Sequence, residues 1–470
     1  MSKNGNRGNI HIIFYDQLFG RRRDSVPIII RKCWIPQQHP GKILFHEETT
    51  AAFIRRHRIK HIFDDISEVP RKLVSGNTVY VFRPADTPVF DAIEKWKMKI
   101  GVDIEYMDNP GFMIKNVKYT GTGKRRLWYR FGDFYRIFRK QTGILMQRNP
   151  HGGDDIPVGG KWSFDSENRQ KITDTSIIPH LPSKPPQQTS IIPHLPKSAE
   201  PFYKILPRDR NGALKWLQKF IAERLKYFGK YQDAIVRGEI GVLLFHSGIS
   251  ALLNVGLLRP LEVVEAILKV KSARMSLENV KNIEAFIRQL VWREFMHCVY
   301  VHFGKDKLLS MNYFSSRGDV PREWYFPDKL DNILPANIPD GFYSGRPDVY
   351  RHPVNETIRR AHRHAYLHHI ERLMVIGNAM SLLGIHPVAA YDWFIRVVAI
   401  DSYEWVMVGN ILMCMFNDGG KIVARKPYLA TTNYILKMSN WKKSEIDKKW
   451  IEEVKKQYHE KIKRVGKFWH

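Results

Sequence analysis

The chain has 470 residues, of which 43% are hydrophobic and 12% aromatic, enough for more than one buried core and too many for a disordered protein. Lysine and arginine number 75 against 47 acidic residues, and the net charge of +28 favours a polyanionic partner such as nucleic acid over a merely solvated basic surface. We expect no membrane association, because no apolar run approaches the roughly 18 residues of a membrane span and the polar segment 1–9 lacks the core of a signal peptide.

The first third of the sequence alternates predicted strands with predicted helices. The strands are expected at 10–14, 27–30, 59–63, 78–82 and 102–106. The helices are expected at 47–58, directly after the apolar run 42–45, and at 91–99. This alternation predicts an α/β domain over residues 8–146, with a parallel, Rossmann-like sheet. The Gly-x-Gly-x-x-Gly fingerprint of ordinary dinucleotide-binding domains does not follow the first strand.

Residues 147–205 are predicted to form a connector, because they are rich in Pro, Gly, Ser and Gln. They contain an identical repeat, since the segment 176–182 recurs as 190–196. Two copies are too few for a repeat fold, so we expect a tandem duplication in an extended loop.

Apolar residues recur at helical spacing from residue 206 to 440, which predicts an all-α domain. Residues 441–470 place Ile446, Trp450 and Val454 four positions apart among many lysines, as in an amphipathic basic helix. Such a helix can dock on the core or contact DNA, and the sequence leaves both roles open.

The cysteines are Cys33, Cys298 and Cys414, which lie far apart and form no Cys-x-x-Cys pair. This usage argues against a disulfide framework and suits a reducing, intracellular compartment. Cytoplasm, nucleus and nucleoid all satisfy that condition, and packaging in a virion stays open.

Closely spaced hydroxyl groups precede a predicted helix near residue 250. Ser247 and Ser250, together with backbone N–H groups, are suited to holding a phosphate or pyrophosphate. The signal is weak by itself, because serine at a helix start is more often only a cap.

Six ordered segments resemble those of one protein family. They are 159–169 (GGKWSFDSENR), 245–258 (FHS…LNVGLL), 286–295 (FIRQLVWREF), 364–374 (HAYLHHIERLM), 401–405 (DSYEW) and 418–435 (DGG…KPY…NYI). The sequence between about residues 10 and 439 is thereby similar to the prokaryotic six-four photolyases of the photolyase/cryptochrome superfamily, also called iron–sulfur bacterial cryptochromes and photolyases. The resemblance implies an α/β antenna domain followed by a helical FAD-binding domain.

The resemblance also implies two chromophores. The residues that it assigns to FAD are Ser247, Ser250, Asn254, Arg372, Asp401, Tyr403, Glu404 and Met407. It further implies a lumazine-type antenna pigment in the N-terminal domain. There Asp16, Gln17 and Leu18 match a family pattern at the end of the first strand, where open α/β sheets bind ligands.

The implied function is light-driven repair of double-stranded DNA that carries UV lesions, by electron transfer from reduced FAD in a monomeric protein. Repair of a six-four photoproduct also needs a proton. His368 and His369 match the family's catalytic pair, with His369 the expected donor, although two histidines on a helix would otherwise more often be structural. Gln289, Trp292 and Arg293 are expected on the lesion side, where core packing is the alternative role of Trp292.

Two features depart from that branch. Lys437 stands where the first of the C-terminal cluster cysteines is expected and none follows, so we predict no iron–sulfur cluster and no other metal site. Met407 stands where the branch has an acid near the flavin. Two functional classes therefore stay open: a light-driven DNA lyase, and a cryptochrome-like or structural DNA-binding relative that keeps the fold without repair.

Overall fold

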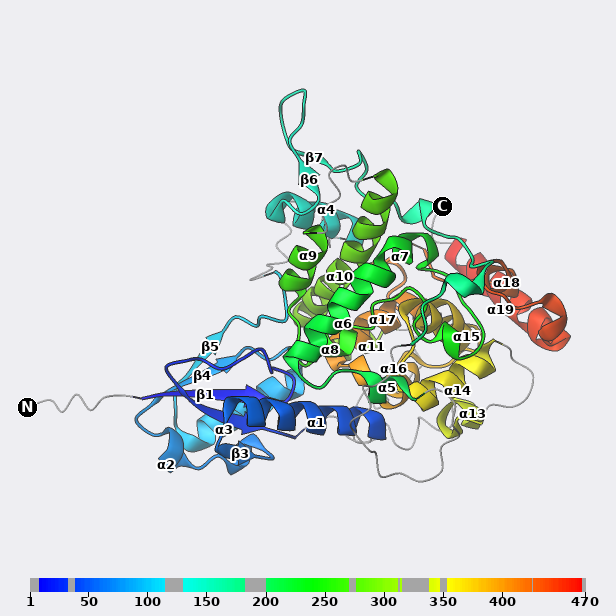
Figure 1. Cartoon of the computed structure of the whole chain (residues 1–470). Coiled ribbons are helices and arrows are strands. Elements are labelled where there is room, and N and C mark those ends of the chain that lie inside the picture. The colour runs from blue at the N-terminus through cyan, green and yellow to red at the C-terminus, as the bar shows by residue number, and fades with distance from the viewer. Residues whose placement is uncertain are drawn as a thin grey trace, which may run out of the picture.

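The computed structural model describes residues 8–32, 39–114, 130–181, 200–269, 276–311, 313–314, 338–346, 353–424 and 426–466. Its N-terminal part is a β-sheet flanked by helices, and the remainder is almost entirely helical (Figure 1). The sheet lies at one end of the molecule, and the C-terminal helix α19 (Lys448–Gly466) lies at the opposite side of the helical part (Figure 1). The predicted fold class, an α/β domain followed by an all-α domain, is confirmed.

The sheet has five parallel strands in the order β3-β2-β1-β4-β5. Their bounds are β1 Asn9–Phe14, β2 Val26–Ile30, β3 His61–Phe63, β4 Thr78–Phe82 and β5 Ile104–Met107. In the central strand β1, Ile12 is paired with Ile28 on one side and Val81 on the other. All three side chains are fully buried, as the near-continuous apolar runs of parallel strands require.

Helix α1 (Pro40–His57) begins earlier than the sequence indicated, so the start predicted at residue 47 is wrong. The apolar run 42–45 already belongs to the helix. Pro40 occupies the first helical position, where its fixed φ suits a helix start, and Nδ1 of His39 accepts a hydrogen bond from the backbone N of Gly41 at 2.9 Å. Helices α2 (Arg71–Val74) and α3 (Thr87–Ile100) complete the cover of the sheet.

The helices of the second part have the following bounds: α5 Phe202–Ile205, α6 Arg210–Glu223, α7 Leu225–Tyr231, α8 Ser250–Asn254, α9 Pro260–Leu268, α10 Leu277–Phe303, α11 Lys305–Leu309, α13 Asp340–Ser344, α14 Val354–His364, α15 Asn378–Leu382, α16 Pro387–Val397, α17 Glu404–Met415 and α18 Thr432–Met438. A π-helix, η6 (Glu371–Gly377), continues directly into α15.

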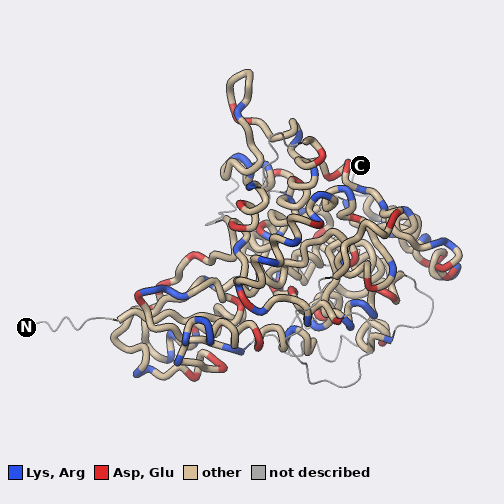
Figure 2. Tube along the Cα trace, in the orientation of Figure 1, with Lys and Arg blue, Asp and Glu red and all other residues tan. Residues whose placement is uncertain are grey.

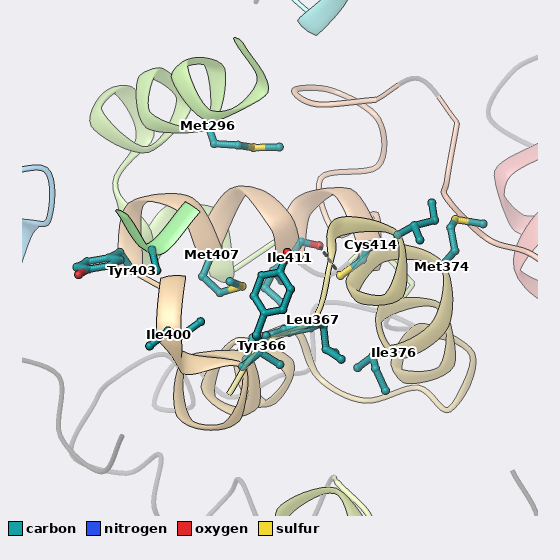
Figure 3. Packing of buried hydrophobic residues seen from close by; sticks show 14 of the residues in the cluster. Met296, Tyr366, Leu367, Met374, Ile376, Ile400, Tyr403, Met407, Ile411 and Cys414 are labelled. Atoms are coloured by element: carbon teal, nitrogen blue, oxygen red, sulfur yellow. Dashed lines mark hydrogen bonds between the residues drawn. The ribbon is translucent and has the colours of Figure 1, made fainter. Parts of the chain in front are cut away.

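Helix α10 is the centre of this part. It spans 27 residues and packs against both α7 and α17. One hydrophobic cluster surrounds it, and Figure 3 shows a section in which Met296 of α10 lies across from Met407 and Ile411 of α17. Gly409 allows this approach, because a Cβ there would lie 2.1 Å from the sulfur of Met296.

Helix α4 (Phe131–Thr142) follows the sheet in sequence but packs on α10. After the short hairpin of β6 (Met146–Gln147) and β7 (Ile156–Pro157), residues 176–181 of the first copy of the duplicated segment lie on the helical part. Ile178 is buried there, and the guanidinium of Arg224 donates to the carbonyl of His180 at 2.7 Å. The second copy lies outside the described residues.

The C-terminal helix α19 docks on the core through Trp450 and Val454, both 3% exposed, and it contacts α15 and α18. The docking role is thereby confirmed. Basic and acidic residues lie close together along this helix (Figure 2). Among the residues the structure describes, no helix combines the length and the hydropathy needed to cross a bilayer.

Candidate functional site

A cavity of about 340 Å³ opens within the helical part, between the segment 246–250, α10, the segment 366–374 and α17. Most of the residues predicted to bind FAD or the lesion line it. They are Ser247, Ser250, Asn254, Gln289, Trp292, Arg293, His369, Arg372 and Asp401. The fold therefore gathers side chains from four distant parts of the sequence around one cavity. The volume of this cavity lies within the range of about 300 to 1,000 Å³ that is usual for small-molecule sites.

The segment before α8 is held rigidly at the cavity wall. The indole N–H of Trp216 donates to the carbonyl of Ser247 at 2.8 Å. Gly248 has φ +63°, and a Cβ there would lie 2.9 Å from both Leu243 and Phe202, so a glycine is required. These contacts present the hydroxyl-bearing residues Ser247 and Ser250 to the cavity.

Asn254 joins three parts of the site. Its side-chain amide donates to the backbone carbonyl of Asp401 at 2.9 Å, and its Oδ1 accepts from the guanidinium of Arg293 at 3.1 Å and 3.2 Å. Arg293 also donates to the carbonyl of Gly111 at 2.5 Å. Each guanidinium nitrogen of Arg293 is therefore engaged within the protein, and burial lowers its pKa to about 10. Arg293 lines the cavity, but its hydrogen bonds connect α10 to its neighbours.

Arg372 and Asp401 form an ion pair in the cavity wall. The guanidinium lies 2.6 Å from Oδ1 of Asp401 and also donates to the carbonyl of Leu367 at 2.7 Å. Both side chains are more than nine-tenths buried. The pair places a fixed positive and a fixed negative charge beside the space without leaving either charge uncompensated.

The histidine pair is divided by the fold. Ala365, with φ 52°, ends α14 in the left-handed conformation, and residues 366–368 are not helical, whereas His369 begins the helical stretch that continues into the π-helix η6. His369 lines the cavity, whereas His368 is 1% exposed and lies behind it. Burial, reinforced by Arg288, lowers the pKa of His369 to about 4, so its imidazole is neutral at pH 7.

Trp292 and Gln289 lie one turn apart on α10 and both line the cavity. One face of the Trp292 indole is stacked on Phe131 of α4, with ring centroids 3.5 Å apart and planes 5° from parallel. Trp292 is half-buried: it packs on Phe131 on one side and borders the cavity on the other.

Three residues assigned to FAD by the resemblance do not line the cavity. The Tyr403 hydroxyl is hydrogen-bonded to Nε2 of His46 at 3.1 Å, and Glu404 accepts from Tyr300 and from Lys305. Met407 is fully buried in the core, close to Ile411 (Figure 3). The residues that α17 presents to the cavity are instead Trp405, Val406, Asn410 and Met413.

A charged group at the cavity was missed by the sequence interpretation. Asp165 is paired with Arg288 and, at 3.0 Å, with Arg169. Burial and the charge of Asp165 raise the pKa of nearby Asp233 to about 6. Asp165 and Arg169 both occur in the family-like segment 159–169, which is the signal that could have found them.

The predicted antenna residues do not line this cavity. Asp16 is 7% exposed, and burial raises its pKa to about 7. Gln17 donates to the carbonyl of Phe82 at 2.9 Å, and the backbone N of Leu18 donates to Val255 at 2.9 Å. Cys298 of α10 and Cys414 of α17 are buried, Cys33 lies outside the described residues, and no metal-ligand cluster occurs within the described ranges.

Comparison with known proteins identifies the family. Residues 55–197 match the family model of deoxyribodipyrimidine photo-lyase-related proteins. The (6-4) photolyase of Agrobacterium fabrum is 30% identical over 392 residues, which cover 82% of this chain and 69% of that protein. An uncharacterized protein of Acanthamoeba polyphaga mimivirus is 46% identical over 71 residues, 15% of this chain and 56% of that protein.

Two solved structures share the fold. The class III photolyase of Agrobacterium tumefaciens has a TM-score of 0.58 at 18% identity, over 88% of this chain and 80% of that chain. The cryptochrome of Synechocystis has a TM-score of 0.55 at 14% identity, over 99% of this chain and 89% of that chain. With this fold, these motifs and a relative matched over most of both sequences, the chain belongs to the photolyase/cryptochrome superfamily.

Proposed function

We propose that this protein is a flavoprotein that repairs UV-damaged DNA in light, with the six-four photoproduct as its substrate. The observation that carries the proposal is the cavity, which brings Gln289, Trp292 and His369 together with the Arg372–Asp401 pair. A lesion needs an apolar face, a polar group that recognises its edge and a source of a proton, and these residues supply each of them.

The cavity suits the FAD that this function requires. Its wall combines apolar side chains with the hydroxyls of Ser247 and Ser250, and it holds the buried His246, whose Nε2 has no hydrogen-bond partner among the described residues. An unpaired buried donor or acceptor is costly, so it favours a polar ligand at this wall. Ser247, Ser250, Arg372 and Asp401 would hold FAD, which when bound supplies a light-activated electron.

The residues of this chain would orient the substrate and move a proton. The free face of Trp292 would stack on a flipped lesion, while Phe131 holds the indole from behind. His369 is neutral at pH 7, since its pKa is lowered to about 4, and the negative charge of a DNA lesion would favour its protonation. His369 then donates through a ring nitrogen to the oxygen transferred during repair.

Double-stranded DNA is the proposed partner, supported by the net charge of +28. We retain a monomeric state, the lumazine-type antenna pigment and the absence of an iron–sulfur cluster as proposals. The whole chain has fewer cysteines than the four that such a cluster uses.

The second candidate is a cryptochrome-like protein that binds flavin and DNA without repair. The departure that favours it is Lys437 in place of the expected cluster cysteine. The deciding experiment is blue-light repair of a defined six-four oligonucleotide by the reduced, flavin-loaded protein. We expect repair by the wild type and a loss of at least about 100-fold in His369→Ala. A wild type that binds flavin and the oligonucleotide but never repairs it would establish the second candidate.

A further inference from the structure

A third histidine packs against the pair. His246, from the segment before α8, is stacked on His368, with ring centroids 4.4 Å apart and planes 14° from parallel. The same ring meets His369 edge to face, at 5.0 Å and 82°. His246 lines the cavity beside His369, whereas His368 is hidden behind it. The two imidazoles that border the cavity therefore come from segments more than a hundred residues apart in the sequence.

Behind these rings lies a buried carboxyl group. Oε2 of Glu371 is 3.5 Å from Nε2 of His368, while Oε1 accepts from the guanidinium of Arg360. Four atoms of this cluster are buried without a hydrogen-bond partner among the described residues: Nε2 of His246, Nδ1 and Nε2 of His368, and Oε2 of Glu371. So many unpaired groups in one place are costly in a purely structural core.

The pKa values of the histidines and of Glu371 in this cluster are shifted in opposite directions. Burial lowers the pKa of His246 and of His368 well below the ordinary value, whereas burial raises the pKa of Glu371 to about 7. The charged groups that face the cluster are Asp165 of the 3₁₀ turn 165–167, Arg288 of α10, Glu356 and Arg360 of α14, and Arg372 of η6. Near neutral pH a proton of this cluster is therefore held by the carboxyl group of Glu371 more often than by an imidazole.

We propose that the imidazoles of His246 and His369 contact the substrate. His368 and Glu371 are positioning residues that hold a proton in reserve for these two imidazoles. The inference rests on the proposed repair function and extends it to His246 and Glu371, to which the sequence interpretation assigned no role. A bound lesion brings negative charge into the cavity, which draws a proton toward the imidazoles that border it.

The transfer balances without a co-reactant. The carboxyl group of Glu371 loses one proton and becomes a carboxylate, which the guanidinium of Arg360 stabilises. The proton passes first to Nε2 of His368, 3.5 Å from Oε2 of Glu371, and an imidazole of the cluster becomes an imidazolium. His369 or His246 donates that proton to the lesion oxygen and is neutral again. The return of a proton from the product restores Glu371.

The test compares matched variants of the full, flavin-loaded chain in single-turnover repair between pH 6 and 9. We expect His246→Gln to lower the repair yield by about 100-fold. The repair yield of the wild type should fall above pH 7, where Glu371 loses its proton, and this pH dependence should be absent in Glu371→Gln. His246→Phe, which keeps the ring stack, should fail like His246→Gln. The control is Glu356→Gln, which also removes a carboxylate from Arg360, at 3.1 Å, but leaves the carboxyl group of Glu371 in place. At pH 6 it should repair within two-fold of the wild type, and its decline should begin at a lower pH, because the charge of Glu356 helps to raise the pKa of Glu371.

A second measurement does not depend on repair. Infrared difference spectra of wild type against Glu371→Gln should reveal a protonated carboxyl band that titrates near pH 7 and persists in Glu356→Gln, where it titrates at a lower pH. Absence of that band overturns the proton reserve, even if the wild type does not repair. Repair by His246→Gln at the wild-type yield overturns the role of His246. If the wild type does not repair while the band is present, the proposed function fails and the reserve stands. Flavin binding and the melting temperature of each variant separate loss of folding from loss of chemistry.

Discussion

The indole of Trp292 and the ring of Phe131 form a nearly parallel stack that joins α4 to α10 at the cavity. Trp292, the residue expected to contact the lesion, belongs to the central helix α10. Its stacking partner Phe131 belongs to α4, which the sequence placed in the α/β domain. The position of Trp292 therefore depends on a helix outside the predicted helical domain.

Replacing Phe131 by Leu should weaken discrimination for the lesion more than it weakens the fold. Leucine keeps most of the buried volume but loses the aromatic stack, worth about 1 kcal/mol, so the ratio of affinities for lesion-containing and intact DNA should fall about five-fold. The control is Phe134→Leu, whose ring meets Phe295 edge to face. Equal affinity ratios in the two variants would contradict the role of the stack.

Breaking the Arg372–Asp401 pair should destabilise the protein and weaken flavin binding together. Asp401→Asn leaves a buried guanidinium without its counter-ion, at a cost of about 3 to 5 kcal/mol in the free energy of unfolding. The double variant Arg372→Gln with Asp401→Asn should recover part of that loss, because no uncompensated charge is left. Urea unfolding and flavin titration measure both effects, and a double variant less stable than Asp401→Asn alone would refute the explanation.

Asp16 should make stability depend on pH. Burial raises its folded-state pKa from 3.8 to about 7, so the folded protein retains a proton that the unfolded chain has released. Between those pH values the folded state binds more protons, and the contribution of Asp16 to stability falls as pH rises, by as much as about 4 kcal/mol.

Asp16→Asn should therefore be more stable than the wild type at pH 8, and the difference should shrink toward pH 4. Chemical unfolding at several pH values provides the measurement. Parallel stability profiles for the two proteins would show that Asp16 is ionised in the fold.

DNA affinity should fall steeply with salt, because the excess of positive charge releases counterions on binding. We expect the docked helix α19 to contribute little, since its exposed Lys455 and Lys456 lie among Glu452, Glu453 and Glu460. The variant Lys455→Gln with Lys456→Gln should keep the slope of log affinity against log salt. A slope smaller by about two would instead place this helix on the DNA.

Local patterns in the sequence were sufficient for the architecture. The apolar runs of β1 and β4, which are buried on both faces, predicted a parallel sheet, and helical periodicity predicted the rest. The start of α1 was missed because the short run Lys42–Phe45, apolar from Ile43 on, has no helical signal of its own, while the cap at His39 and Pro40 determines where the helix begins.

The candidate site depended on both levels. Ordered motifs brought out Ser247, Trp292, His369 and Arg372, and the cavity collects them. Sequence proximity misled where the chain leaves regular helix: the left-handed Ala365 and the π-helix η6 send His368 into the core.

Tertiary packing alone decided which residues became their partners. Phe131 reached Trp292, and His246 reached the histidine pair, only because α4, α8 and the segment after α14 pack around α10. The sequence by itself determined the elements, the charge and the residue types of the site, since these follow from local propensity and composition. Which face each side chain presents, and which buried group it meets, follows from long-range packing, which one-dimensional periodicity does not encode.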